Sequence, residues 1–246
     1  MRKNNLCRFL PALYAGILLL AVTGCATSDK REYFGSGPIA LVSLVANDDI
    51  NWKDEAPLNP NLTTRSARRT MQEDPDKNMV TSSNEFIDEI ETLIRNTLES
   101  AAFITFAERD RVLRSQSYNE AGINSLQEKD QMAKPQGFRY INFRDNKFLS
   151  ALYTETGIGN ALYINLNLTK FMYSGFGKNG NYRANVSMSV MLKNEQGKTL
   201  YNKTYQLSSR DNADVSGGIY SQSDLRHLLI SAIEDACYYF LDDLAY

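Results

Sequence analysis

Eight residues from Ile39 to Ala46, IALVSLVA, constrain the fold of this 246-residue chain more than any other feature. The run is almost entirely apolar, rich in β-branched residues, of strand length, and preceded by Pro38. Such a run is typical of a strand that is covered on both faces, because a strand with one wet face would alternate polar and apolar residues. Helices are therefore expected to pack on at least one face of the sheet that contains it.

The segment after residue 81 predicts a helix and then a short strand. Ser82 and Glu85 have the spacing of a capping box, so a helix is expected to begin there. Its apolar residues recur at three- and four-residue spacing and predict a stripe that faces the core. The charged residues of the same segment are expected to face water; they are Asp88, Glu89, Glu91, Arg95 and Glu99. Residues 103–108 predict a second short strand, and residues 109–118 a charged helical segment.

The C-terminal part predicts a helix ending near Gly157, a strand over 161–169, and a hairpin. Polar and apolar residues alternate over 182–192, which indicates a strand with one covered face. Gly197 suits the left-handed position of the turn that leads into a returning strand over 199–207. A last helix opens at residues 221–224, and one apolar stripe along it must pack on the sheet. This stripe comprises Leu225, Leu228, Leu229, Ala232, Ile233, Ala236, Cys237, Phe240, Leu241 and Leu244.

These elements predict an α/β fold, a mixed β-sheet packed with helices, in a single domain over residues 38–246. Residues 47–81 interrupt it as a long polar excursion that carries three prolines and a basic cluster. A connection of this length inside a compact domain is either functional or disordered. The segment GFGKNG over 175–180 matches G-x-G-x-x-G, but it joins two predicted strands, so we interpret it as a hairpin loop and not as a dinucleotide site.

Residues 1–24 have the pattern of an export signal that leads into a cysteine. A basic beginning precedes an apolar run that is too short to span a bilayer as a helix. Val22-Thr23-Gly24-Cys25 resembles the lipobox of bacterial lipoproteins, in which the signal is removed and the cysteine is acylated. The resemblance implies lipid attachment at Cys25, a flexible tether over 25–37, and a stable membrane anchor, since more than one acyl chain is attached. With no Asp directly after the cysteine, it further implies an outer-membrane lipoprotein that faces the periplasm.

Three later segments are similar to a domain shared by several envelope proteins. They are residues 83–113, 148–169 and 184–209, with Asp110, Arg111, Leu113, Gly157, Gly197 and Lys198 as matching points. The domain occurs in the curli-secretion lipoprotein family, in the lipoprotein activators of penicillin-binding proteins, and at the N-terminus of the Tol-system propeller protein. This resemblance implies an α/β fold and a role in envelope assembly or activation, and it assigns no activity to particular residues.

Composition and residue types argue against several classes of function. Loss of the leader removes Arg2, Lys3 and Arg8 and changes the formal net charge from −2 to −5, so nucleic acid is not an expected partner. Cys237 would be the one cysteine left besides Cys25; we interpret it as a buried small hydrophobe, with a reactive thiol as the alternative. The single histidine, His227, is expected to be a surface residue of the last helix. The pairs at 48–49 and 242–243 are expected to be solvated.

We therefore predict no catalytic residues, no metal site and no cofactor, and interpret the chain as a non-enzymatic envelope lipoprotein that binds a protein partner. The alternative is a subunit of an outer-membrane secretion pore of the curli-secretion type, although residues 109–143 lack the apolar alternation of a lipid-facing strand. Trp52, Arg65, Arg68 and Arg69 are the predicted partner-binding residues, because interfaces draw on Trp and Arg. A second interpretation is that Trp52 closes the edge of the core while the arginines lie on a disordered loop.

Overall fold

A computed structural model describes residues 37–53 and 65–245. The signal segment, Cys25 and almost all of the predicted tether lie outside these residues. Eight strands form one mixed sheet in the order β1-β4-β5-β7-β8-β3, with β2 beside β4 and β6 beside β5. The strands are β1 Ile39–Ala46, β2 Asn51–Trp52, β3 Lys77–Asn78, β4 Asn160–Phe176, β5 Asn179–Asn194, β6 Thr199–Ser208, β7 Ala213–Ser216 and β8 Ile219–Ser221. The helices are α3 Arg65–Glu73, α4 Ile87–Glu99, α5 Arg109–Leu113, α6 Gln116–Glu120, α7 Ser125–Lys129, α8 Asn146–Thr156 and α9 Gln222–Ala245.

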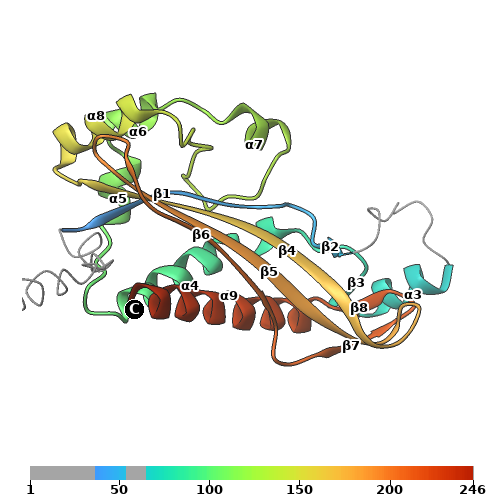
Figure 1. The fold of residues 1–246 in the computed structure, drawn as a ribbon. Helices are drawn as coiled ribbons and strands as arrows, with labels where there is room; N and C mark the ends of the chain where they lie inside the picture. Colours follow the sequence, from blue (N-terminus) through green and yellow to red (C-terminus); the bar gives the residue numbers. More distant parts are fainter. Residues whose placement is uncertain (1–36, 54–64, 246) are drawn as a thin grey trace, which may run out of the picture.

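Every residue of β1 is buried, as its composition predicted. The strand runs parallel to β4, and helices cover both of its faces (Figure 1). On one face Ile39, Leu41 and Leu44 join the larger hydrophobic cluster under α4 and α9. On the other face Ala40 and Val42 join a smaller cluster with α5, α6 and α8. The predicted α/β class, a mixed sheet packed with helices in a single domain, is confirmed.

The hairpin of β4 and β5 forms the long axis of the sheet. The two strands pair from Asn160–Asn194 at one end to Phe176–Asn179 at the other. The GFGKNG segment forms the tip of this hairpin, as predicted, and Gly175 and Gly180 face each other there. A Cβ atom on Gly175 would lie 2.1 Å from the backbone oxygen of Asn179, so the close approach of the strands requires glycine.

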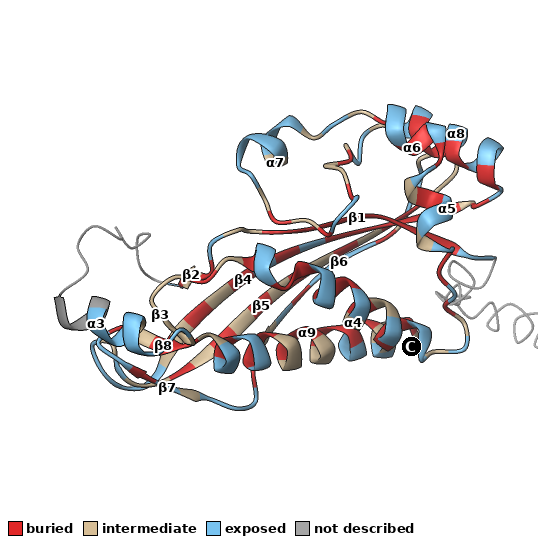
Figure 2. Cartoon of the chain, turned by 180° about the vertical axis from the view of Figure 1, so that it is seen from behind, coloured by how far each residue is buried: buried red, intermediate tan, exposed pale blue. Residues whose placement is uncertain are grey.

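Helix α9 lies along the sheet and buries nearly the whole predicted stripe; Leu241 is half-buried. Figure 2 shows the buried side of α9 turned toward the sheet and the exposed side turned outward. Phe240 is fully buried against the rings of Tyr201 and Tyr205, at centroid distances of 5.4 and 6.1 Å. Cys237 is also buried, and burial raises the pKa of its thiol to about 12, which keeps it protonated and inert.

Two glycines have the left-handed backbone conformation that their predicted positions at a helix end and in a turn require. Helix α8 ends at Gly157, which has a φ of 72°, and its N–H bonds the carbonyl of Tyr153 as a C-cap. Gly197 has a φ of 79° in the turn between β5 and β6. Beside this turn the register passes from the Leu192–Tyr201 pair to the Lys193–Thr199 pair, so Leu200 of β6 is an extra residue, as in a β-bulge.

Two expectations for the secondary structure of residues 82–108 are wrong in detail. The capping serine, Ser82, caps a 3-10 turn at Ser83–Glu85, and α4 begins only at Ile87. Residues 103–108 form no strand; Phe106 makes a single parallel bridge to Ile39. The chain turns away there because α5 begins at Arg109 and must reach the opposite face of β1.

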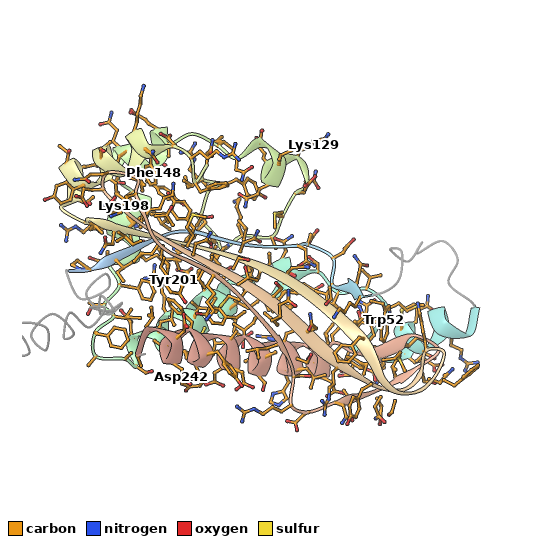
Figure 3. The ribbon with its side chains drawn as sticks, viewed as in Figure 1. Trp52, Lys129, Phe148, Lys198, Tyr201 and Asp242 are labelled. Atoms are coloured by element: carbon orange, nitrogen blue, oxygen red, sulfur yellow. The ribbon has the colours of Figure 1, made fainter. Side chains whose placement is uncertain are left out.

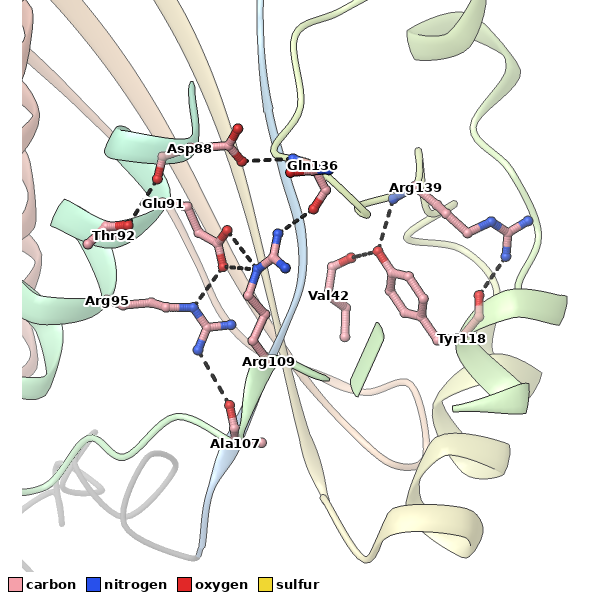
Figure 4. A network of polar contacts seen from close by, with 10 residues as sticks. All are labelled: Val42, Asp88, Glu91, Thr92, Arg95, Ala107, Arg109, Tyr118, Gln136 and Arg139. Carbon is pink, nitrogen blue, oxygen red and sulfur yellow. Dashed lines mark hydrogen bonds and ion pairs between the residues drawn. The ribbon is translucent and has the colours of Figure 1, made fainter. Parts of the chain in front are cut away.

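Glu91 is buried, although its helical position predicted that it faces water. Its side chain is 6% exposed and pairs with Arg95 at 2.9 Å and with Arg109 at 3.0 Å (Figure 4). Arg95 lies one turn later on α4, whereas Arg109 opens α5. The carboxylate therefore joins the two helices across the edge of β1. Next to it Tyr118 donates to the carbonyl of Val42, which ties α6 to the same strand.

Candidate partner-binding surface

The polar excursion at 47–81 contains short elements attached to the far end of the sheet. Strand β2 pairs with Thr169 and Lys170 of β4, and β3 pairs with Tyr220 and Ser221 of β8. Helix α3 lies between them in the chain. Figures 1 and 2 both show α3 at one end of the molecule, beside the tip of the β4–β5 hairpin, while the start of β1 and helices α5 and α8 lie at the opposite end. We call the α3 end the distal end.

Trp52 lies inside the core at the distal end (Figure 3). It is 5% exposed and packs edge-on against Tyr182 at 6.0 Å. Lys170 and Lys178 place their ammonium groups 5.3 and 5.7 Å from the indole ring. The indole therefore closes the edge of the core, which is the second of our two interpretations. Its ring presents no open face to a partner.

Two of the three predicted arginines fall in the first turn of α3 and the third follows directly; they are Arg65, Arg68 and Arg69. The side chain of Arg69 is 79% exposed and pairs with Glu73 at 2.7 Å. An exposed pair one helical turn apart contributes little to stability, about 0.3–0.5 kcal/mol. The fold thus gathers the basic cluster on one nine-residue helix, whereas the second of our two interpretations placed the arginines on a disordered loop.

Asp76 connects the excursion to α9. Its carboxylate accepts hydrogen bonds from the backbone N–H of Ser223 at 2.9 Å and from the hydroxyl of Ser223 at 3.0 Å, while its carbonyl accepts from Gln222. These contacts satisfy donors that the first turn of a helix leaves unpaired. Hydrogen bonding from Ser221, with smaller contributions from Ser223 and Lys77, lowers the pKa of Asp76 below its ordinary value of 3.8, and partial burial opposes this effect.

A cleft of about 420 Å³ opens beside Asp76, between the first turns of α4 and α9. Arg226 of α9 pairs with Glu89 of α4 across it, with Nε 2.6 Å from the carboxylate. Gln222 reaches Glu85 at 3.4 Å, and His227 lines the same wall. The lining carries both charge signs in solvated, mutually paired side chains. Such a surface can dock a complementary polar surface. We call α3 and this cleft together the distal surface.

The remaining candidates have structural roles or stay exposed. His227 is exposed on α9, as expected. Asp48 accepts hydrogen bonds from Ser82 and Asn84 and so holds the turn before α4. Across residues 37–53 and 65–245, no group of His, Cys, Asp and Glu side chains has the arrangement of a metal site.

Asp243 corrects our expectation that the 242–243 pair is solvated. Asp242 is exposed, but Asp243 accepts hydrogen bonds from Tyr201 and Tyr205 and pairs with Lys203 at 2.7 Å. Burial raises the pKa of Tyr205 to about 12, and neighbouring Asp243 contributes to this rise. The two aspartates differ in their surroundings because adjacent residues of a helix point in different directions, and only Asp243 faces β6.

Sequence reasoning missed the cleft because its walls are distant in the chain. Glu89 and Arg226 are 137 residues apart, and Asp76 and Ser223 are 147 apart. The sequence signal was the acidic and polar first turn of each helix, which predicts two helix starts but not that they lie side by side.

Comparison with known proteins gives no family. No family model matches the chain, and no curated protein matches it. Among solved structures, the LpoB C-terminal domain from Salmonella enterica aligns with a TM-score of 0.26 and 10% sequence identity, over 69% of this chain and 82% of that chain. A likeness at this level transfers neither detailed structure nor function. Within the described ranges, no helix has the length and apolarity needed to cross a membrane.

Proposed function

We propose that this chain is a non-catalytic lipoprotein of the bacterial cell envelope, anchored in the outer membrane by acylated Cys25, that binds a periplasmic protein partner through its distal surface. One observation carries the proposal: the chain enters the fold at the end of the sheet opposite α3 (Figure 1). The cleft is lined by Asp76, three residues after the end of α3. A lipid at Cys25 would hold the entry end toward the membrane and leave the distal surface free.

The dimensions suit this arrangement. Gly37 lies twelve positions after Cys25, and an extended chain over that span reaches at most about 40 Å. Strand β4 has 17 residues, and at about 3.3 Å per residue it extends roughly 55 Å toward the distal end. The distal surface would therefore stand well clear of the lipid headgroups, where a partner in the periplasm can reach it.

The chemistry of the distal surface indicates a partner with an acidic face. The mature chain carries net negative charge, yet α3 has three arginines and one glutamate. Arginine is enriched at interfaces because its planar fork bonds carboxylates with two parallel hydrogen bonds. We expect acidic side chains of the partner to bind α3, while its polar groups fill the cleft beside Arg226.

Crosslinking in intact cells tests this proposal. A photoreactive residue placed at exposed Gln72 should capture one defined envelope protein, and the double variant Arg68→Glu/Arg69→Glu should abolish the adduct. The matched control, Lys147→Glu/Lys198→Glu, makes the same charge change on exposed residues at the entry end and should leave the adduct intact. Equal melting temperatures verify that both variants fold.

A deletion variant provides a second test of the proposal. Replacement of residues 57–73 by a short Gly/Ser linker removes α3 but keeps Asp76 and its bonds to α9, and the closure entropy of such a loop is small. The folded deletion variant should lose the partner. If it folds and keeps its partner at wild-type level, α3 does not bind the partner and the proposed role of its arginines is wrong.

A further inference from the structure

The face of the sheet opposite α9 is uncovered beyond α6, α8 and residues 122–145, and three consecutive rows of its side chains are uncharged. Three strands contribute to this face, and the strand register aligns their residues in these three cross-strand rows. The rows are Asn165–Ser189–Thr204, Asn167–Ser187–Gln206 and Thr169–Asn185–Ser208. The next row is Phe171–Arg183, where the guanidinium of Arg183 lies over the ring of Tyr173 at 3.8 Å. All nine side chains of the three rows are exposed or half-exposed amides and hydroxyls. Charged residues make up 23% of the chain, so about two would be expected among nine surface positions, and soluble surfaces usually carry more.

A cleft of about 160 Å³ lies at one end of this face. Its floor is the next row of the register, Tyr163–Met191–Asn202, together with Asn165 and Ser189. Its roof comes from residues 122–145, which carry α7 and lie on the same side of the sheet as α6 and α8 (Figures 1 and 2). Gln127 and Phe143 reach the cleft from this roof. We call it the hooded cleft.

Two polar atoms in the walls of the hooded cleft are unsatisfied. The hydroxyl of Tyr163 and Oε1 of Gln127 are buried and have no hydrogen-bond partner within the part of the chain that the structure describes. Tyr163 as a whole is 7% exposed. An unmade buried hydrogen bond costs about 1–3 kcal/mol, so such groups require an explanation. Burial, aided by the charge of Asp145, raises the pKa of Tyr163 and keeps its hydroxyl a donor, while the oxygen of Gln127 is an acceptor.

The lining selects for a neutral ligand. Each amide offers a donor and an acceptor side by side, which suits vicinal hydroxyls and acetamido groups. Phe143 is 36% exposed and offers an apolar ring to the C–H side of a sugar. Two cationic side chains near Phe143 already have partners. Lys193 donates to the carbonyl of Phe143 at 2.7 Å, and the guanidinium of Arg144 lies over the Phe143 ring at 5.5 Å.

We propose that the hooded cleft and the three uncharged rows bind a neutral glycan chain. One pyranose ring with hydroxyl or acetamido substituents occupies the cleft and bonds Tyr163 and Gln127. The following sugar units lie along the rows of Asn, Ser, Thr and Gln. The volume of the cleft is below the 300–1,000 Å³ of typical drug-sized pockets, which fits one sugar ring. This site is separate from the distal surface and does not depend on the proposed protein partner.

Calorimetric titration of the full chain in detergent tests the proposal with three tetrasaccharides. The probes are the neutral tetramers of N-acetylglucosamine and of glucose and the anionic tetramer of galacturonate. At least one neutral tetramer should bind with a Kd below about 10 mM, and the anionic one should bind at least about tenfold more weakly. The same titration includes a Ser/Asn-rich tetrapeptide.

Two variants locate the site. Tyr163→Phe should weaken glycan binding about fivefold or more, the loss of one hydrogen bond, while the melting temperature stays the same or rises because an unpaired hydroxyl is gone. Asn165→Ala, at an exposed position that does not support the core, should weaken binding similarly. The control Asn96→Ala changes an exposed amide on α4 and should have no effect. The proposal is overturned if no neutral tetramer binds, if both variants bind as wild type, or if the anion or the peptide binds at least as tightly.

Discussion

The carboxylate of Asp76 lies 2.9 Å from the backbone nitrogen of Ser223, although 147 residues separate the two in the chain. A helix normally takes its N-cap from the residue just before it. Ser221 caps α9 in this way and accepts from the backbone N–H of Asp224 at 3.0 Å, and the excursion adds a second acceptor from a remote segment. The end of the excursion and the start of α9 are therefore coupled. Any partner that moves α3 would act on the first turn of α9.

Asp76→Ala should destabilise the fold by about 1 kcal/mol, the usual cost of a lost helix cap. Because the pKa of Asp76 is lower in the folded chain than its ordinary value of 3.8, the ionised carboxylate stabilises the fold above that pH, and this contribution is lost as pH falls through the folded-state value. Asp76→Asn should keep most of the cap but lose this pH dependence. Denaturant titrations at pH 7 and below pH 4 measure both effects, with exposed Asp211→Ala as the control.

Glu91→Gln should destabilise the fold by about 1–3 kcal/mol, because it leaves Arg95 and Arg109 without their shared carboxylate. Glu89→Gln is the matched control on the same helix. Glu89 also pairs with an arginine, but its side chain is 44% exposed, so the loss should stay below about 1 kcal/mol. Equal losses in urea titrations would show that burial does not distinguish the two pairs.

The sequence predicted the structure correctly wherever the pattern that determines an element lies within one short segment. The full burial of Ile39–Ala46, the stripe of α9 and the cap at Gly157 follow from apolar spacing and turn chemistry within a few residues. Glu91 and Asp76 show the limit. Helical spacing puts Glu91 on the polar side of α4. Its side chain is buried because Arg109 of the next helix packs over it. The composition of residues 47–81 pointed to the arginines of α3. It could not predict the cleft, because the opposing wall of the cleft belongs to α9.

Asp243→Asn should cost about 1–3 kcal/mol, whereas Asp242→Asn should change stability by less than about 0.5 kcal/mol. Asp243 accepts from two tyrosine hydroxyls of β6 and pairs with Lys203, while Asp242 is exposed. Thermal unfolding of the two variants side by side measures the difference. Indistinguishable melting temperatures would contradict the inferred role of Asp243 in fixing α9 to β6.

Phe240→Ala should destabilise the fold by about 3–5 kcal/mol, because the fully buried ring packs against Tyr201 and Tyr205 and its removal leaves a cavity. The neighbouring residue is an internal control: Tyr239 is 57% exposed, and Tyr239→Ala should change stability by less than about 1 kcal/mol. Chemical denaturation monitored by circular dichroism measures both. A Phe240→Ala midpoint equal to that of wild type would refute the packing of α9 on the sheet.

Cys25→Ala tests the proposed membrane anchor. Without the thiol no acyl chain can be attached, so we expect a precursor that retains residues 1–24 and is poorly processed, detectable by mass spectrometry of the purified chain. A chain that begins at Ser28 lacks both the signal and the lipid, and the described core starts only at Gly37, so it should melt at the same temperature as the mature protein. Because two acyl chains are needed for stable anchoring, this shortened chain should remain in the soluble fraction after mixing with lipid vesicles. Sedimentation of the shortened chain with the vesicles would show that a surface other than Cys25 holds the protein to the membrane.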